Sequence, residues 1–147
     1  RAQAIADHTR TLAELLTAPA PIGPGDGWQP RSLAGVEVIA QPHCHHHAVM
    51  GWDADAALLA MAGATVRTLS GCCGMAGNFG MEKGHYDVSV KVANNALLPQ
   101  LNAAAAHVVY LADGFSCRTQ AEQLAGRRGV HLAELLLIGP PRAPHDA

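Results

Sequence analysis

Four cysteines are the residues of this chain whose type and spacing point most directly to chemistry. Cys44 is followed by 27 other residues, then by the adjacent pair Cys72 and Cys73, and then by 43 residues before Cys117. Structural zinc sites usually take their cysteines from tight knuckles with about two to four residues between them, and this spacing contains no such knuckle. We therefore expect the fold to bring the four thiols together as one metal or redox site.

A glycine-rich loop surrounds the cysteine pair. Between Ser70 and Gly84 a glycine recurs at about every third position. Adjacent cysteines on an extended chain point in opposite directions, so both can face one centre only where the backbone bends sharply, and Gly74 permits such a bend. Glycines also leave backbone N–H groups uncovered, and such groups form a concave anion site with the start of a following helix. A four-iron cluster with four thiolates is anionic, and backbone N–H groups that donate to its sulfurs raise its reduction potential. This environment therefore suits such a cluster better than it suits zinc.

Other uses of the cysteines stay open from the residues alone. Some of the thiols could join the nearby histidines in a zinc-binding structural or interaction module. Cys72 and Cys73 could instead exchange electrons with a thiol or disulfide substrate, which would need no metal. The four cysteines could also form two disulfides, or they could be small buried hydrophobic residues, as free cysteines often are.

Histidines surround the first cysteine in the run from His43 to His47. Imidazoles can ligate a metal, or they can donate hydrogen bonds to it or to a bound substrate. We expect at most one or two of them, His43 and His46, to belong to the site. The alternative is an exposed loop that binds zinc or nickel only adventitiously.

Three residues outside the histidine run are candidates for the surroundings of the thiols. His85 comes directly after the glycine-rich loop, and Gly74 follows the cysteine pair. Arg118 comes directly after Cys117 and could balance the charge of a cluster or contact an acidic partner. An ordinary surface arginine is the alternative. None of these residues is expected to be catalytic.

Strands alternate with helices along the chain, which is the pattern of a small parallel sheet flanked by helices. The residue patterns predict strands at 36–40, 65–69 and 107–112 and helices at 2–16, 53–61, from 81 or 85 to 98, 116–124 and 131–138. Asp53 and Ser116 can cap helices, and Pro99 marks a helix end. Ligands in such α/β folds gather at the carboxyl ends of the strands. Each cysteine falls just beyond the end of a predicted strand, so the four thiols should meet at one edge of the sheet.

At 147 residues the chain has the length of one ordinary domain. We divide it into an N-terminal helix with a proline- and glycine-rich linker at 1–34, the α/β domain at 35–139 and a flexible tail at 140–147. The net charge of −2 and the scattered Lys and Arg residues argue against a nucleic-acid partner. No apolar stretch reaches the ~20 residues of a transmembrane segment.

The chain begins with Arg1 rather than Met, so we expect a piece of a longer polypeptide. No charged segment followed by an apolar one opens the chain as a secretion signal would. Cysteines without a secretory context indicate a reducing compartment. We expect a cytoplasmic protein that is peripheral to a membrane at most through its partners.

The sequence resembles the CCG, or cysteine-rich, domain family. The resemblance rests on the segment from Gly71 to Gly77, with His43-Cys44-His45 upstream and Gly114-Phe115-Ser116-Cys117 downstream, and it covers roughly residues 35–136. That family includes the CCG-containing subunit of heterodisulfide reductase and the iron–sulfur subunit of glycolate oxidase. More closely, residues 44–47 and 71–86 resemble the C-terminal end of large FAD-linked D-2-hydroxyacid dehydrogenases of the D-lactate dehydrogenase type.

The resemblance implies an electron-transfer role. Reduced flavin would pass electrons through iron–sulfur centres to an acceptor, and by position Cys44, Cys72, Cys73 and Cys117 would be the ligands of one 4Fe–4S cluster. The implied partner is an FAD-containing dehydrogenase domain of the same or an associated polypeptide. The chain has no flavin motif and no ferredoxin-type cysteine run. It would therefore be part of an oxidoreductase that does not oxidise a hydroxyacid alone.

The chain departs from the family pattern in two ways. The last element of the family is usually a Cys-x-x-Cys pair, but Gly114 stands where its first cysteine would be. Several relatives contain two CCG copies, and this chain has one. Four cysteines still suffice for one ordinary four-iron cluster, whereas clusters that need more thiolates are out of reach.

Overall fold

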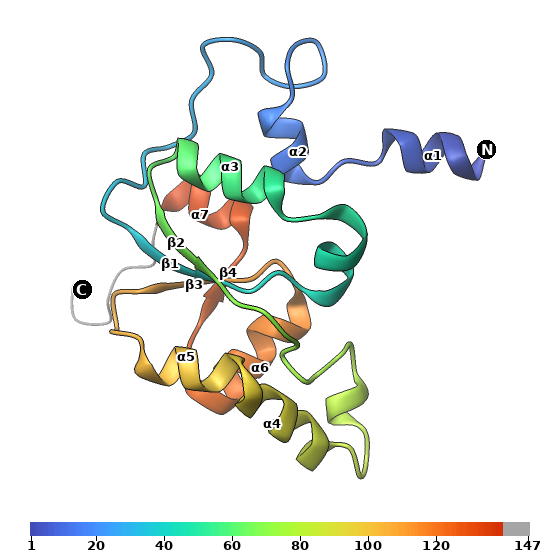
Figure 1. Ribbon diagram of the computed structural model, residues 1–147, viewed down its shortest axis with the longest axis vertical. Helices are drawn as coiled ribbons and strands as arrows, with labels where there is room; N and C mark the ends of the chain where they lie inside the picture. Colours follow the sequence, from blue (N-terminus) through green and yellow to red (C-terminus); the bar gives the residue numbers. More distant parts are fainter. Residues whose placement is uncertain (140–147) are drawn as a thin grey trace.

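A four-stranded parallel sheet forms the centre of the fold (Figure 1). The structure, a computed structural model, describes residues 1–139, and the predicted flexible tail at 140–147 lies outside them. The strands lie in the order β2-β1-β3-β4, and each pairs with its neighbour in the parallel sense. Their bounds are β1 Glu37–Ala40, β2 Thr65–Thr68, β3 Val109–Leu111 and β4 Gly129–Val130. The predicted α/β fold class is thus confirmed.

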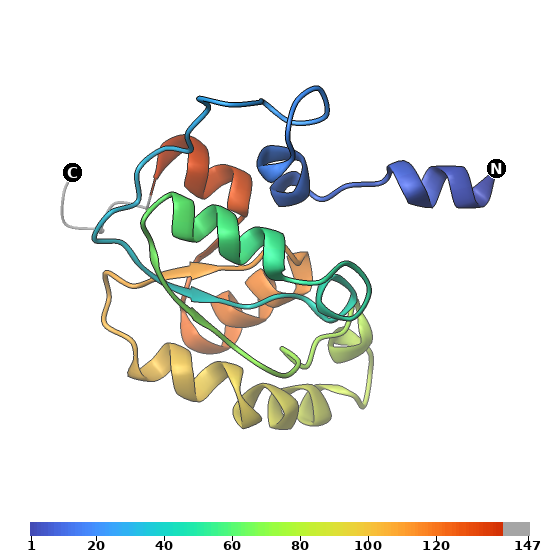
Figure 2. The ribbon, with the colours of Figure 1, turned by 45° about the horizontal axis from the view of Figure 1, so that its top comes forward.

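Helices cover both faces of this sheet (Figures 1 and 2). One side carries α3 Asp53–Met61 and α7 Leu132–Ile138, with α2 Leu12–Thr17 packed on α3; the other carries α4 Tyr86–Asn95, α5 Leu97–Ala103 and α6 Phe115–Ala125. Successive side chains of a strand point to opposite faces. Val38 and Ala40 therefore join the core beneath α3 and α7, whereas Ile39 joins the core beneath α5 and α6. Among residues 1–139, no helix combines the length and the apolar character that crossing a membrane requires.

The N-terminal segment forms two short helices, where a single helix over 2–16 was predicted. α1 Ala2–His8 ends at Thr9, whose backbone is extended, and α2 begins after Thr11. The break has a local cause, because Thr11 and Glu14 form a capping box. The Thr11 hydroxyl accepts a hydrogen bond from the Glu14 N–H, and the Glu14 carboxylate accepts one from the Thr11 N–H. α1 has no buried residue and projects away from the sheet (Figure 1).

Three predicted helix ends are wrong in detail. Pro99 does not end a helix but lies in the first turn of α5, where a backbone N–H would have no partner within the helix. The helix predicted to run to residue 98 breaks instead at Ala96, between α4 and α5. Neither Asp53 nor Ser116 caps its helix, because each lies inside the first turn.

The glycine-rich loop over 70–84 packs closely against α4, beyond the end of β2. Gly74 has φ +92°, in the left-handed region that favours glycine. A Cβ on Gly74 would lie only 2.1 Å from the backbone oxygen of Ser89 in α4. The loop approaches the helix so closely only because this side chain is missing, and the contact fixes the segment that carries the cysteine pair.

Replacing Gly74 with alanine should therefore destabilise the fold by more than the backbone conformation alone explains. Gly84→Ala is the matched control, since Gly84 has φ +91° but a Cβ there would meet nothing within 4 Å. We expect Gly84→Ala to lower the free energy of unfolding by about 1 kcal/mol, and Gly74→Ala to lower it by at least about 2 kcal/mol more. Denaturant unfolding followed by circular dichroism measures both, and equal losses would contradict the role given to this contact.

Candidate metal centre

A cavity of about 550 Å³ opens at the carboxyl ends of the strands, and all four cysteines line it. Cys44 follows β1, Cys72 and Cys73 follow β2, and Cys117 lies in the first turn of α6, which follows β3. The rest of the wall comes from two histidines, the glycine-rich loop and the turn after β3: His43, His45, Ala76, Gly77 and residues 113–116. We call this the cysteine cavity. Three strands thus deliver the four cysteines to one edge of the sheet.

The four thiols are free and differ in exposure. Cys73 and Cys117 are buried, each with 3% of its surface exposed, whereas Cys72 is half-buried and Cys44 is exposed. The two buried thiols are neighbours that interact with each other, and Cys72 interacts in the same way with Cys44. One side of the set, at Cys44, is therefore exposed to solvent, and the other side, at Cys73 and Cys117, is buried. A group bound among the four thiols would contact solvent on one side only.

Backbone N–H groups of the glycine-rich loop are directed at two of the sulfurs. The Gly74 N–H donates to Cys72 Sγ at 3.3 Å, and the N–H groups of Met75 and Ala76 donate to Cys73. Ala76 has φ +46°, which is an uncommon conformation for a residue with a side chain. The loop is thus held in a shape that turns successive N–H groups toward sulfur, as in other anion-binding backbone turns.

These hydrogen bonds lower the pKa of Cys73. The Cys117 thiol that donates to Cys73 is the largest cause, and the N–H groups of Met75 and Ala76 add to it. Together they lower the pKa of Cys73 from the ordinary 9.0 to about 6, although burial opposes the shift. The pKa of Cys117 is raised, because its thiol keeps the shared proton and is buried. Cys73 is therefore the thiol that is ready as a thiolate ligand at neutral pH.

No three of the sulfurs lie as close together as the ligands of one zinc ion do. With Zn–S bonds of about 2.3 Å, tetrahedral ligands lie about 3.8 Å from one another. Within residues 1–139, the only group of three or more His, Cys, Asp or Glu residues whose ligand atoms all lie within 4.8 Å of one another is His46, Asp55 and Asp113. No three of the cysteines meet this limit. A four-iron cluster takes four cysteine thiolates and is larger than one ion, so its ligands need not all lie within this limit.

His43 lines the cysteine cavity and explains why residue 114 is glycine. Its Nδ1 accepts a hydrogen bond from the His46 backbone N–H at 3.2 Å, so the proton of the neutral ring is on Nε2. Burial lowers the pKa of His43, and nearby His46 adds to the shift. A Cβ on Gly114 would lie 2.8 Å from His43 Cβ and 3.2 Å from Cys117 Sγ. The extra cysteine of the CCG pattern therefore has no room beside this histidine.

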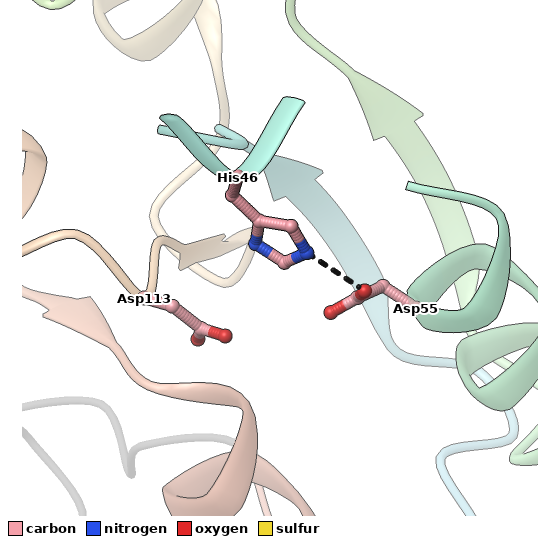
Figure 3. Close-up of side chains that lie close together, drawn as sticks. All are labelled: His46, Asp55 and Asp113. Carbon is pink, nitrogen blue, oxygen red and sulfur yellow. Dashed lines mark hydrogen bonds and ion pairs between the residues drawn. The ribbon is translucent and has the colours of Figure 1, made fainter. Parts of the chain in front are cut away.

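Two of the predicted neighbours of the thiols are not among the residues that line the cavity. His46 is buried, and its Nε2 lies 3.1 Å from a carboxylate oxygen of Asp55 (Figure 3). His85 stacks on Phe79 with their ring centroids 4.2 Å apart. Both histidines thus have other partners, and the structure gives neither a contact with sulfur.

Arg118 forms hydrogen bonds with backbone oxygens beside the cavity. Its guanidinium donates hydrogen bonds to the backbone oxygens of Ala112 and Asp113 at 2.7 and 2.9 Å. It thereby fixes the turn between β3 and α6, which carries the wall of the cavity, and it is not a lining residue. His45 and Asp113 are lining residues that were not predicted. Asp113 is the second residue after the end of β3, so the rule that strand ends carry ligand residues would have found it.

The donor set at the cavity is chemically compatible with a four-iron cluster. Four cysteines are the usual ligands of such a cluster, and hydrogen bonds from backbone N–H groups to sulfur are a common feature of its environment. Both features occur here on a half-buried set of free thiols.

The pKa of Cys73 predicts a thiolate in the metal-free, reduced protein. One thiol per chain should ionise with a midpoint near 6, which ultraviolet thiolate absorbance can follow. Because the unfolded thiol ionises near 9.0, the folded state releases this proton first. Cys73 should therefore stabilise the metal-free fold increasingly as the pH rises from about 6 to about 9.

Two variants check the assignment of this thiolate. Cys73→Ser should remove the transition near pH 6, and Cys72→Ser should leave it, because burial raises the pKa of Cys72. If the first thiol of the wild type ionised only above about pH 8, the hydrogen bonding assigned to Cys73 would be wrong.

Comparison with known proteins finds no relative of this chain. No family model, no curated protein and no solved structure matches the chain. The likeness to CCG domains therefore rests on the sequence motifs alone.

Proposed function

We propose that the protein is the iron–sulfur electron-transfer domain of a flavin-linked 2-hydroxyacid oxidoreductase, with one 4Fe–4S cluster held by Cys44, Cys72, Cys73 and Cys117. The observation that carries the proposal is the convergence of four free thiols on one cavity, with backbone N–H groups directed at two of the sulfurs. The resemblance to CCG domains supports the flavin and hydroxyacid part of the proposal.

The side chains of the cavity would hold the cluster and shield one side of it. An iron–sulfur cluster supplies one-electron redox chemistry when it is bound. Cys73 offers a thiolate near neutral pH, and the other three thiols lose their protons on binding. Met75 and Tyr110 pack with Cys73 and Cys117 and are each 2% exposed. They exclude water from the inner side, and such exclusion controls the potential of a metal site.

Electrons would pass through the exposed side of the cysteine cavity. Cys44 and His45 are exposed there, and Phe115, which also lines the cavity, has 75% of its surface exposed. Exposed aromatic side chains are enriched in protein interfaces. The proposal therefore puts the FAD-containing dehydrogenase domain, or the electron acceptor, against this rim. It also puts the protein in the cytoplasm, where thiols stay reduced.

One observation favours a second function, thiol–disulfide exchange. A pKa near 6 is typical of a reactive thiol, and Cys73 has it. Access argues against this function, because Cys73 is almost fully buried and its more exposed neighbour, Cys72, has a raised pKa. The accessible sulfur of the pair is thus protonated at neutral pH. A zinc-binding module comes third, because no three of the sulfurs lie within 4.8 Å of one another.

Cys73→Ser should prevent assembly of the cluster. In protein prepared without oxygen, we expect the iron and acid-labile sulfide of this variant to fall below about a tenth of the wild-type content, since it loses the most acidic ligand thiol. Ser70→Ala is the control, because Ser70 is exposed in the same loop and lines no part of the cysteine cavity.

The same preparations separate the three functions. Full retention of iron and sulfide in Cys73→Ser would refute the ligand set. Metal-free wild-type protein that reduces a disulfide substrate, and loses this activity in Cys73→Ser, would favour thiol–disulfide exchange.

A further inference from the structure

Three polar side chains from three different segments converge next to the cysteine cavity (Figure 3). His46 begins the helical turn His46–Met50 after β1, Asp55 lies in the first turn of α3, and Asp113 lies in the turn after β3. Their ligand atoms all lie within 4.8 Å of one another. His46 and Asp55 are 4% and 2% exposed. None of the three is a cysteine, although Asp113 also lines the cysteine cavity, so the group is a second set of possible ligands beside the four thiols.

His46 is held by Asp55 in an orientation that leaves one ring nitrogen free. Its Nε2 lies 3.1 Å from Asp55 Oδ2. Among residues 1–139, the hydrogen bonds of His46 that involve its side chain or backbone N–H use Nε2 and the backbone N–H and not Nδ1. Figure 3 shows Nδ1 on the side where Asp113 lies. When Nε2 carries the proton that it donates to Asp55, the lone pair of the ring is on Nδ1. A buried imidazole thus keeps an unused electron-pair donor toward a second carboxylate.

The charges of the group are not balanced by the protein. Within the described part of the chain, no Lys or Arg nitrogen lies within 4.0 Å of the carboxylate of Asp55 or Asp113. Asp113 accepts a hydrogen bond from the Leu132 N–H at 2.7 Å, and the ring of His131 is 3.7 Å away. Burial raises the pKa of Asp55, the negative charge of Asp113 adds to this rise, and His46 opposes it. Two nearby carboxylates, one of them buried, therefore have only the histidine rings of His46 and His131 within 4.0 Å as possible counterions in the described part of the chain.

A divalent cation would bind the free electron pair of His46 and would balance the negative charge of Asp55 and Asp113. Two ligands bound at about 2.0–2.1 Å to one tetrahedral ion lie about 3.4 Å apart, and the ligand atoms of the three residues already lie within 4.8 Å of one another. One imidazole with two carboxylates is a donor set that suits Mn²⁺, Fe²⁺ or Zn²⁺, whereas soft metals prefer thiolates. We propose that His46, Asp55 and Asp113 bind one divalent cation of this class, at a site that adjoins the cysteine cavity at Asp113 and uses none of the four thiols.

Such a cation would connect the segments that build the cysteine cavity. His46 lies two residues after Cys44, and Asp113 begins the turn that leads to Cys117. Asp113 also accepts the hydrogen bond from the start of α7. The cation would therefore fix two of the three cysteine-bearing segments relative to α3 and α7. Its binding does not depend on whether the thiols hold a cluster.

Mn²⁺ is the probe that separates this site from the thiols, because it prefers oxygen and nitrogen ligands to sulfur. Titration of the reduced, metal-free chain, followed by the EPR signal of free Mn²⁺, should show one bound ion per chain. Asp113→Asn and Asp55→Asn should each weaken this binding at least about tenfold. Asn keeps the size of Asp, and at position 113 its oxygen can still accept the hydrogen bond from Leu132. Circular dichroism checks that each variant is folded.

Two controls make the result specific. Asp53→Asn changes an exposed carboxylate two residues away in the same helix and should leave Mn²⁺ binding unchanged. Cys73→Ser should also leave it unchanged, which distinguishes this proposal from the iron–sulfur proposal.

Three outcomes would overturn the cation site. The first is no Mn²⁺ binding by the wild type at millimolar concentration. The second is equal binding by the wild type and both aspartate variants. The third is loss of binding in Cys73→Ser, which would assign the ion to the cysteine cavity. Should an aspartate variant not fold, pulsed EPR of Mn²⁺ on the wild type still decides, since bound Mn²⁺ without coupling to an imidazole nitrogen contradicts ligation by His46.

Discussion

All four strands of the sheet run in the same direction, and this constraint decides where the polar residues of the chain meet. Parallel strands end at one edge, so the segments after β1, β2 and β3 are neighbours there although they are far apart in the sequence. Helices cover both faces of such a sheet, which leaves this edge for the loops. The cysteine cavity and the group of His46, Asp55 and Asp113 both lie at it.

Close packing gives this edge its electrostatic character. The glycine-rich loop approaches α4 closely at Gly74, and its N–H groups are then directed at the sulfurs of Cys72 and Cys73. The same hydrogen bonds that stabilise a thiolate in the metal-free protein would donate to a bound cluster. Backbone geometry, rather than a basic side chain, thus provides the favourable environment for negative charge. Arg118, the nearest candidate for such a role in the sequence, is instead used to fix the turn after β3.

Much of this arrangement could be predicted because strand ends are marked locally. β1 is an apolar run between Gly35 and Pro42, and the α/β alternation then places each cysteine beyond a strand. The capping box of Thr11 and Glu14 could also have been recognised in the sequence, because Thr followed three residues later by Glu is its signature. Contacts between segments that are distant in the sequence could not be predicted from local patterns. Nothing local shows that His46 pairs with Asp55, and the two-residue strand β4 exists only because β3 lies beside it.

Metal analysis of the wild-type protein purified without oxygen tests most directly whether the four cysteines hold an iron–sulfur cluster. We predict about four irons and four acid-labile sulfides per chain, together with the broad visible absorbance of a bound cluster. One zinc per chain with no sulfide would contradict the account. The cysteine cavity would then be a zinc-binding site, and the likeness to CCG domains would not extend to its chemistry.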